Sequence, residues 1–153
     1  MGSLVKTVNM KVYRKIHLNF LTLMCLMAVA SFLLVRQGIY INWNFEESNI
    51  TVDIVLIAMI GLAILFSLYS RRQKIKLHAI DEFEEKLSFH RRYFLIRMWW
   101  LLVSGTFSCF LFVLTTYRFF FWFVLFDFLS FLLAFPNKLL FKRELNDDEI
   151  IFL

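Results

Sequence analysis

The sequence has few of the residues that break helices and few that carry chemistry. Four glycines and one proline occur among its 153 residues. The two cysteines, Cys25 and Cys109, show neither CxxC spacing nor a neighbouring histidine, so we expect free thiols that pack as small apolar groups. HExxH, GxSxG and Walker motifs are missing, which argues against metalloprotease, hydrolase and nucleotide-binding activities.

The histidines are also few, and their positions do not favour a cofactor. His17, His78 and His90 fall at the ends of apolar stretches or between them. A haem site in a helical bundle needs histidines well inside the apolar stretches. The sequence therefore predicts no cofactor, no metal site and no catalytic residue.

What the chain has in excess is apolar surface. Hydrophobic residues make up 60% of the sequence, aromatic residues 19%, and the mean hydropathy is +0.67. An ordinary soluble domain is about 45–50% apolar, and a chain this short buries too little of its surface to hide more. These values exclude a soluble enzyme and a disordered chain, and they indicate an integral membrane protein.

Four apolar stretches are long enough to be membrane spans, because crossing a ~30 Å hydrocarbon core takes roughly 20 residues. The last two stretches are separated only by Tyr117 and Arg118. A single helix over both would be roughly 57 Å long, so we expect a turn near 115–118. The predicted fold is an all-α, single-domain four-helix membrane bundle over 1–153, with spans at about 18–35, 51–70, 95–117 and 119–135.

The basic residues predict the orientation. Four Lys and Arg residues precede the first span, eight lie within 71–97, between the uncharged stretches of spans two and three, and three lie in the tail. Only Arg36 and Arg118 lie in the other two connections. The net charge of +5 therefore reflects topology and does not indicate nucleic-acid binding, and the positive-inside rule places both termini in the cytoplasm.

The cytoplasmic connection, 71–94, is the largest polar segment. Asp81 followed by Glu84 fits a capping box, which predicts a short amphipathic helix from about Glu82 that either stands alone or continues into the third span. Its basic ends are candidates for contact with the membrane surface or with a partner. These residues are Arg71, Arg72, Lys74, Lys76, Arg91 and Arg92. The tail, 136–153, is predicted to be a short interfacial helix followed by an acidic end.

Asp127 is the midpoint of the fourth span, where an acidic side chain is costly and a functional candidate by default. A hairpin that turns between Tyr117 and Arg118 places Asp127 level with Ser108, one helical turn from Ser104. We therefore predict that Asp127 faces these serines. Small residues at a similar depth are predicted helix-packing positions, namely Ala28, Gly61 and Gly105.

Two functions remain open for such a chain. The first is a non-catalytic accessory, assembly or scaffold subunit of a larger membrane complex. The alternative is a proton- or ion-coupled transport or channel component that uses Asp127, although the scarcity of helix-breaking residues weakens a transporter interpretation. The expected partners are the lipid bilayer and either another membrane protein or further copies of the chain. A bacterial inner membrane is favoured over a eukaryotic internal membrane.

Overall fold

The computed structural model describes residues 6–40, 49–146 and 150–152, and these ranges contain five helices and one pair of short strands. The helices are α1 (Met10–Arg36), α2 (Asn49–His78), α3 (Phe83–Thr115), α4 (Arg118–Leu133) and α5 (Lys138–Leu145). The strands β1 (Thr7–Val8) and β2 (Ile151–Phe152) pair in parallel. The all-α prediction is confirmed, and the short strand pair is a feature that it does not include.

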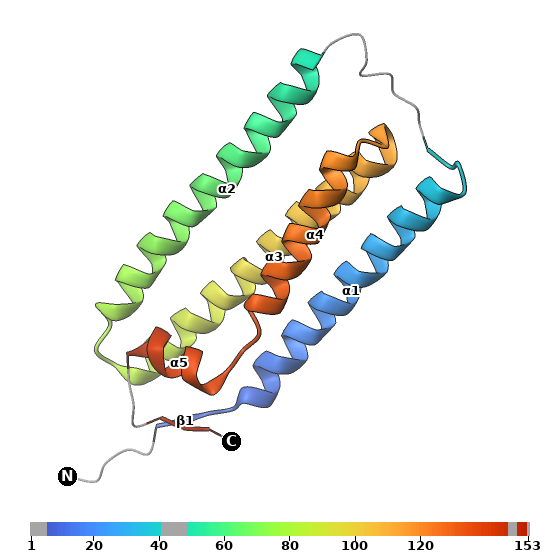
Figure 1. Cartoon of the computed structure of the whole chain (residues 1–153). Coiled ribbons are helices and arrows are strands. Elements are labelled where there is room, and N and C mark those ends of the chain that lie inside the picture. The colour runs from blue at the N-terminus through green and yellow to red at the C-terminus, as the bar shows by residue number, and fades with distance from the viewer. Residues whose placement is uncertain (1–5, 41–48, 147–149, 153) are drawn as a thin grey trace, which may run out of the picture.

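Three helices form a packed unit, and the fourth long helix lies to one side of it. Figure 1 shows α3 and α4 as an antiparallel hairpin with α1 packed along it, whereas α2 stands apart. In the most apolar 18-residue window of each helix, half of the residues of α3 are buried, compared with 11% for α1 and 6% for α2. The helices therefore differ far more in packing than in hydropathy.

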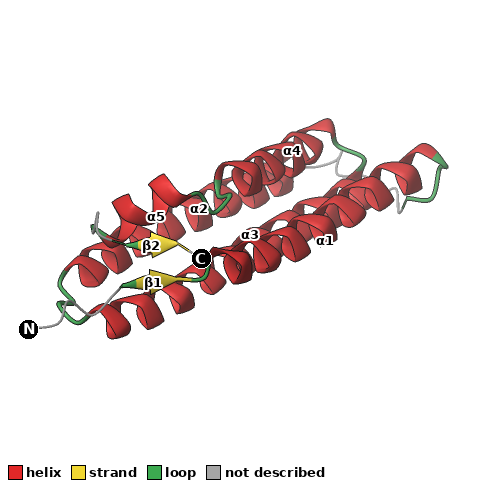
Figure 2. Cartoon of the chain, turned by 90° about the horizontal axis from the view of Figure 1, so that it is seen from below, coloured by secondary structure: helices red, strands yellow, loops and turns green. Residues whose placement is uncertain are grey.

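The strand pair and α5 lie together at one end of the molecule, which we call the terminal end (Figure 2). The starts of α1 and α3 and the end of α2 are at the same end (Figure 1). The chain bends by 83° between α4 and α5, so α5 crosses this end of the bundle. Most of the basic residues are therefore gathered at one end.

The turn between α3 and α4 is formed where the length argument places it. The helix α3 ends at Thr115, and Thr116 adopts a left-handed conformation with φ 54°. The Tyr117 backbone N–H donates to Thr115 Oγ1 at 3.3 Å, which gives a polar partner to a group just outside the helix. The helix α4 begins at Arg118, so the hairpin register is set by these few residues.

The main apolar core lies between α1, α3 and α4 and continues beneath α5. Met24 of α1, Phe131 of α4 and Phe141 of α5 are almost completely buried in it. A smaller cluster links α2 to the other end of the hairpin through Met59 and Phe120. The described part of α2 is thus attached to the hairpin by a limited set of contacts.

The helix predicted from about Glu82 is present, and it takes the second of its two expected forms, because α3 begins at Phe83 and continues into the third apolar stretch. A separate short helix is not formed in the described chain, and α2 continues to His78. The connection contains neither glycine nor proline, and both long helices extend into it, which leaves only residues 79–82 between them. The predicted cap is wrong, because Asp81 does not cap this helix. Glu82 occupies that position and makes no side-chain capping hydrogen bond.

Three helices, α1, α2 and α3, are long and apolar enough to cross a membrane. The bent pair α4 and α5 gives a fourth candidate if it is counted as one span. The chain is therefore suited to a bilayer by length and composition.

Candidate functional site

The hairpin brings the acid of the fourth apolar stretch to two serines of α3. Ser104 Oγ lies 3.2 Å from Asp127 Oδ1 and 3.1 Å from Oδ2, and Ser108 Oγ lies 3.3 Å from Oδ2. Ser108 and Asp127 are buried. The contact predicted from the hairpin count is therefore present in the structure.

The hydroxyl protons limit how these bonds can be made. A serine hydroxyl has a single proton, so Ser104 shares it between the two carboxyl oxygens. Ser108 Oγ is also 3.0 Å from the backbone carbonyl of Ser104, one turn earlier, and must choose between that carbonyl and Asp127. Asp127 thus accepts one hydrogen bond from Ser104 and, when Ser108 turns toward it, a second, and both serines belong to the facing helix α3.

Gly105 lies beside this contact and faces α1. A Cβ at this position would collide with the end of the Met24 side chain, and it would lie 3.7 Å from Asp127 Cβ. Met24 is fully buried, so the missing side chain of Gly105 leaves the space that the end of the Met24 side chain occupies. Ala28 of α1 is partly buried against the same core.

Gly61 does not behave in the same way. Nothing in the described structure lies within 4 Å of the position that its Cβ would take. The close packing predicted at this residue is therefore not seen. Counting residues places Gly61 at a similar depth to Asp127, but depth does not determine which way a helix position faces.

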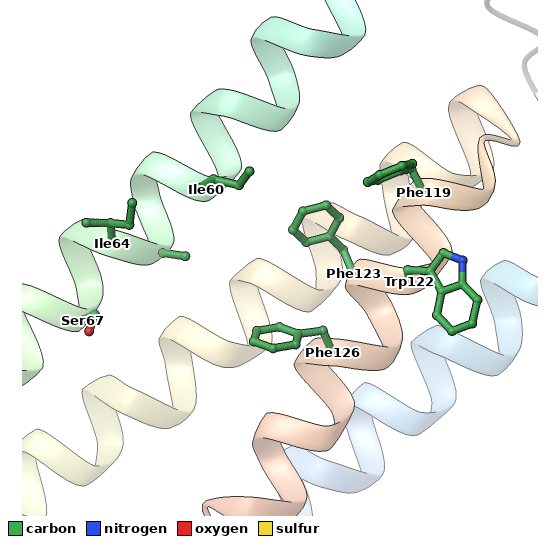
Figure 3. Close-up of a pocket in the computed structure, with 8 residues that line it drawn as sticks. Ile60, Ile64, Ser67, Phe119, Trp122, Phe123 and Phe126 are labelled. Carbon is green, nitrogen blue, oxygen red and sulfur yellow. The ribbon is translucent and has the colours of Figure 1, made fainter.

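Two adjacent cavities separate α2 from the hairpin, and we call them together the α2 cleft. One, of about 580 Å³, lies between α2 and α4, where Phe123 and Phe126 extend from α4 toward α2 (Figure 3). The other, of about 540 Å³, also reaches α3, and it shares Ala63, Phe123 and Phe126 with the first. The cleft is walled almost wholly by apolar side chains.

On the hairpin side, three polar side chains interrupt that apolar wall. Ser104, Asp127 and Ser130 line the second cavity. Asp127 therefore has two surroundings at once, since it accepts hydrogen bonds within the hairpin and also contributes to the wall of the α2 cleft. We take the α2 cleft with Asp127 as the candidate functional site.

A second polar cluster at the terminal end was not predicted. Glu144 of α5 accepts a 2.9 Å hydrogen bond from His90 of α3. Its carboxylate also lies 3.7 Å from the Arg97 guanidinium and 4.0 Å from Lys74 Nζ of α2. The Glu144 backbone carbonyl is 3.2 Å from His78 Nε2, again on α2. This Glu144 cluster joins α2, α3 and α5.

The Glu144 cluster also perturbs the carboxyl group itself. Burial alone would raise the pKa of Glu144. The hydrogen bond from His90 and the charges of His90, Arg97 and Lys74 together outweigh burial, so the pKa lies below its ordinary value. Glu144 is therefore a carboxylate near neutral pH.

The predicted basic surface residues divide into three groups. Arg71, Arg72 and Lys76 are exposed on the last turns of α2. Lys74 is half exposed and faces Glu144 instead of being available as a free surface charge. Arg91 and Arg92 line a separate groove between α1 and α3.

The described groups around Asp127 offer hydrogen bonds to its carboxyl. Asp127 is held by hydroxyls without an adjacent histidine or lysine in the described contacts, which gives no nucleophile and base pair. No group of three His, Cys, Asp or Glu residues within the described ranges is placed to hold a metal ion. Comparison with protein-family models, curated proteins and solved structures gives no match. Function must therefore be argued from the geometry.

Proposed function

We propose that the chain is a four-span integral membrane protein with both termini in the cytoplasm, in a bacterial inner membrane. The support is the gathering of the basic residues at the terminal end, with only Arg36 and Arg118 in the other two connections. The 16 residues of α4 span about 24 Å, so residues 134–137 complete its crossing before α5 turns along the surface.

Within that membrane its role is that of a non-catalytic accessory, assembly or scaffold subunit. The α2 cleft receives a transmembrane helix of another membrane protein. The observation that carries this proposal is the contrast between the length of α2 and its isolation: only 6% of its most apolar window is buried, and an apolar cleft separates it from the hairpin. The described contacts of α2 with the rest of the chain are few: Met59 packs on the hairpin, the Phe66 ring stacks on Trp100, and the last turns join the Glu144 cluster. A partner helix therefore has few contacts to displace.

A helix fits the α2 cleft better than a lipid chain does. Ala63 and Ser67 are one turn apart on the face of α2 that lines the cleft, and small residues at this spacing allow helix backbones to approach closely. The opposite wall offers the polar groups of Ser104, Asp127 and Ser130. A lipid tail has no group to pair with them, whereas a partner helix can carry a donor at that depth.

Site-specific photo-crosslinking tests this proposal. A photoreactive residue at Ser67 should capture a membrane protein of different sequence in membranes of the native host. The same residue at Leu65, which is exposed and lines neither cavity, should capture much less. Equal capture at both positions, or capture only of a second copy of this chain, would overturn the partner-helix proposal.

A matched pair of substitutions provides the second arm. Ala63→Leu fills the α2 cleft and should reduce capture at Ser67 at least tenfold. Ala58→Leu makes the same change on the same helix at an exposed position outside the cleft and should leave capture unchanged. If Ala63→Leu captures the partner as well as the wild type does, the cleft is not the docking surface.

The alternative function is a proton- or ion-coupled transport or channel component. The observation that favours it is the position of Asp127 in the wall of a cavity, where a titrating carboxyl is accessible from the α2 side. The hydrogen bonds from Ser104 and Ser108 favour a structural role instead, in which the Asp127 carboxyl locks α4 to α3 within the hairpin. Asp127→Asn separates the two functions.

A further inference from the structure

A groove at the terminal end lies between the start of α1 and the first half of α3. Its volume is about 570 Å³. Val12 and Tyr13 of α1 form one wall, Leu87 and Leu95 of α3 form the other, and Arg91 and Arg92 lie on the α3 side. The groove is thus apolar inside and carries two guanidinium groups at its edge. We call it the terminal groove.

The α1 wall of the terminal groove is firmly held. Val8 and Tyr13 are buried, at 1% and 5% exposure, and β1 is fixed by pairing with β2. The Tyr13 ring packs edge-on against Phe141 with ring centroids 4.7 Å apart. Asn9 caps α1 by accepting a hydrogen bond from the Lys11 backbone N–H at 3.1 Å. A ligand in this groove would meet a largely formed surface.

The charges on the edge are not neutralised by the protein. Arg91 and Arg92 are exposed and have no ion-pair partner within 4.0 Å among the described residues. Arg97, two turns further along α3, differs because its guanidinium lies 3.7 Å from Glu144. Glu84 also lines the terminal groove, but it is seven residues before Arg91, or roughly 10 Å along the helix. The two guanidinium groups are therefore available to an anion.

The terminal groove lies where a bilayer places its headgroups. The uncharged stretches begin at Leu18 in α1 and at Met98 in α3. Tyr13 is five residues outside the first, and Arg92 is six residues outside the second, so both are about 8–9 Å from the start of the apolar region. Headgroup layers extend roughly 5–8 Å beyond the hydrocarbon core, and an arginine side chain reaches several ångströms further. Leu95 lies between Arg92 and the hydrocarbon.

We propose that the terminal groove binds one anionic phospholipid, with its phosphate at Arg91 and Arg92, its glycerol region against Val12 and the start of one acyl chain against Leu95. Guanidinium groups pair with phosphate through two parallel hydrogen bonds, which suits this pair of side chains. Leu95 lies three residues nearer the uncharged stretch of α3 than Arg92 does, so an acyl chain that leaves the charged edge toward the hydrocarbon passes it. This proposal rests on the proposed membrane placement but not on the partner helix.

Titration of the purified full chain with single lipids in detergent, read by native mass spectrometry, tests the site. The probes are phosphatidylglycerol, phosphatidylcholine and inorganic phosphate. We expect one phosphatidylglycerol to bind with at least tenfold preference over phosphatidylcholine. The double substitution Arg91→Gln with Arg92→Gln should remove that preference, because each basic residue near the headgroups raises the affinity for an anionic lipid roughly fivefold. The matched pair Arg71→Gln with Arg72→Gln, exposed on α2, should retain it.

The outcomes that overturn the proposal are distinct. Equal loss of preference in both double variants would show a diffuse basic surface in place of a site. Inorganic phosphate that occupies the site alone and abolishes the preference would exclude a lipid-specific groove. Val12→Trp narrows the groove without changing charge, and unchanged phosphatidylglycerol binding in that variant would place the lipid elsewhere. None of these measurements depends on crosslinking at Ser67, so a failure of the partner-helix proposal remains distinguishable.

Discussion

The helices α2 and α3 are similar in length and hydropathy but differ in what surrounds them. They contain 30 and 33 residues, yet the apolar window of α3 is half buried and that of α2 is 6% buried. Apolar surface by itself cannot bring helices together in lipid, because the lipid tails are equally apolar. The helix that packs is the one that presents Ser104, Gly105 and Ser108 to its neighbours.

The comparison also explains why α2 is available to a partner. Its small cleft-facing residues, Ala63 and Ser67, are not used by the described chain for close helix packing. At the terminal end α2 is joined to the rest through Lys74, His78 and the Glu144 cluster. In its middle, α2 touches α3 by stacking the Phe66 ring on Trp100, whereas α3 packs closely along its apolar part. Each prediction below removes one of the features that distinguish the two helices.

The largest effect on stability is expected for Glu144→Gln, which removes the carboxylate shared by α2, α3 and α5. His90 is fully buried and loses a charge-assisted partner, and such hydrogen bonds contribute about 1.5–3 kcal/mol. We expect a loss of about 2–3 kcal/mol in the free energy of unfolding in micelles, followed by circular dichroism. Glu85→Gln, an exposed carboxylate on the same end, is the control and should cost less than about 0.5 kcal/mol.

Gly105→Leu should be the next most damaging, at about 2 kcal/mol, because the added side chain collides with buried Met24 and forces α1 away from α3. Gly61→Leu makes the same change on α2 in open space and should be neutral. The measurement is thermal unfolding of both variants in the same detergent. Equal destabilisation would mean that α2 packs as closely as α3 does, which would remove the contrast between the two helices.

The pH dependence of the Glu144 cluster should give a smaller effect. The pKa of Glu144 is lowered from its ordinary value of 4.5, so the carboxylate contributes its full stabilisation above that value and loses it as the pH falls through the lowered pKa. The wild type should therefore lose stability below about pH 5 more steeply than Glu144→Gln does. Parallel pH profiles for the two proteins would show that another group controls the acid limb.

The sequence predicts the contacts that depend only on helix length and on a tight turn between neighbouring helices. The turn at 115–118 is forced by helix length, and the register of a tight hairpin then brings Asp127 to Ser104 and Ser108. Gly61 shows the limit of the same reasoning, because its depth can be counted but its facing depends on how α2 packs.

The Glu144 cluster could not be predicted, because its groups come from three helices and His90 is 54 residues from Glu144. Lys142 and Arg143 precede Glu144 in the sequence, so this stretch is typical of a solvated polar helix. Its burial depends on the 83° bend after α4, which folds α5 across the end of the bundle. Local sequence carries no signal for that angle.

The smallest expected effect on stability is for substitutions of Asp127. These variants distinguish a carboxyl that locks the hairpin from one that takes part in transport. Hydrogen bonds between membrane helices average about 0.6 kcal/mol, so Asp127→Leu, which frees both serine hydroxyls, should cost about 1 kcal/mol. Asp127→Asn keeps an acceptor for those hydroxyls and should cost less than half of that. The measurement is unfolding in micelles, with both variants compared with the wild type.

A flux assay completes this test. A proton relay requires the side chain at position 127 to gain and lose a proton, and an asparagine cannot do so. In liposomes carrying a pH-sensitive dye, we expect the wild type and Asp127→Asn to be equally impermeable to protons, and both to support crosslinking at Ser67 in membranes. Proton flux through the wild type that disappears in Asp127→Asn, while stability is retained, would replace the scaffold role with the transport alternative. Loss of crosslinking in Asp127→Leu but not in Asp127→Asn would instead show that the carboxyl acts by holding the hairpin wall of the α2 cleft in place.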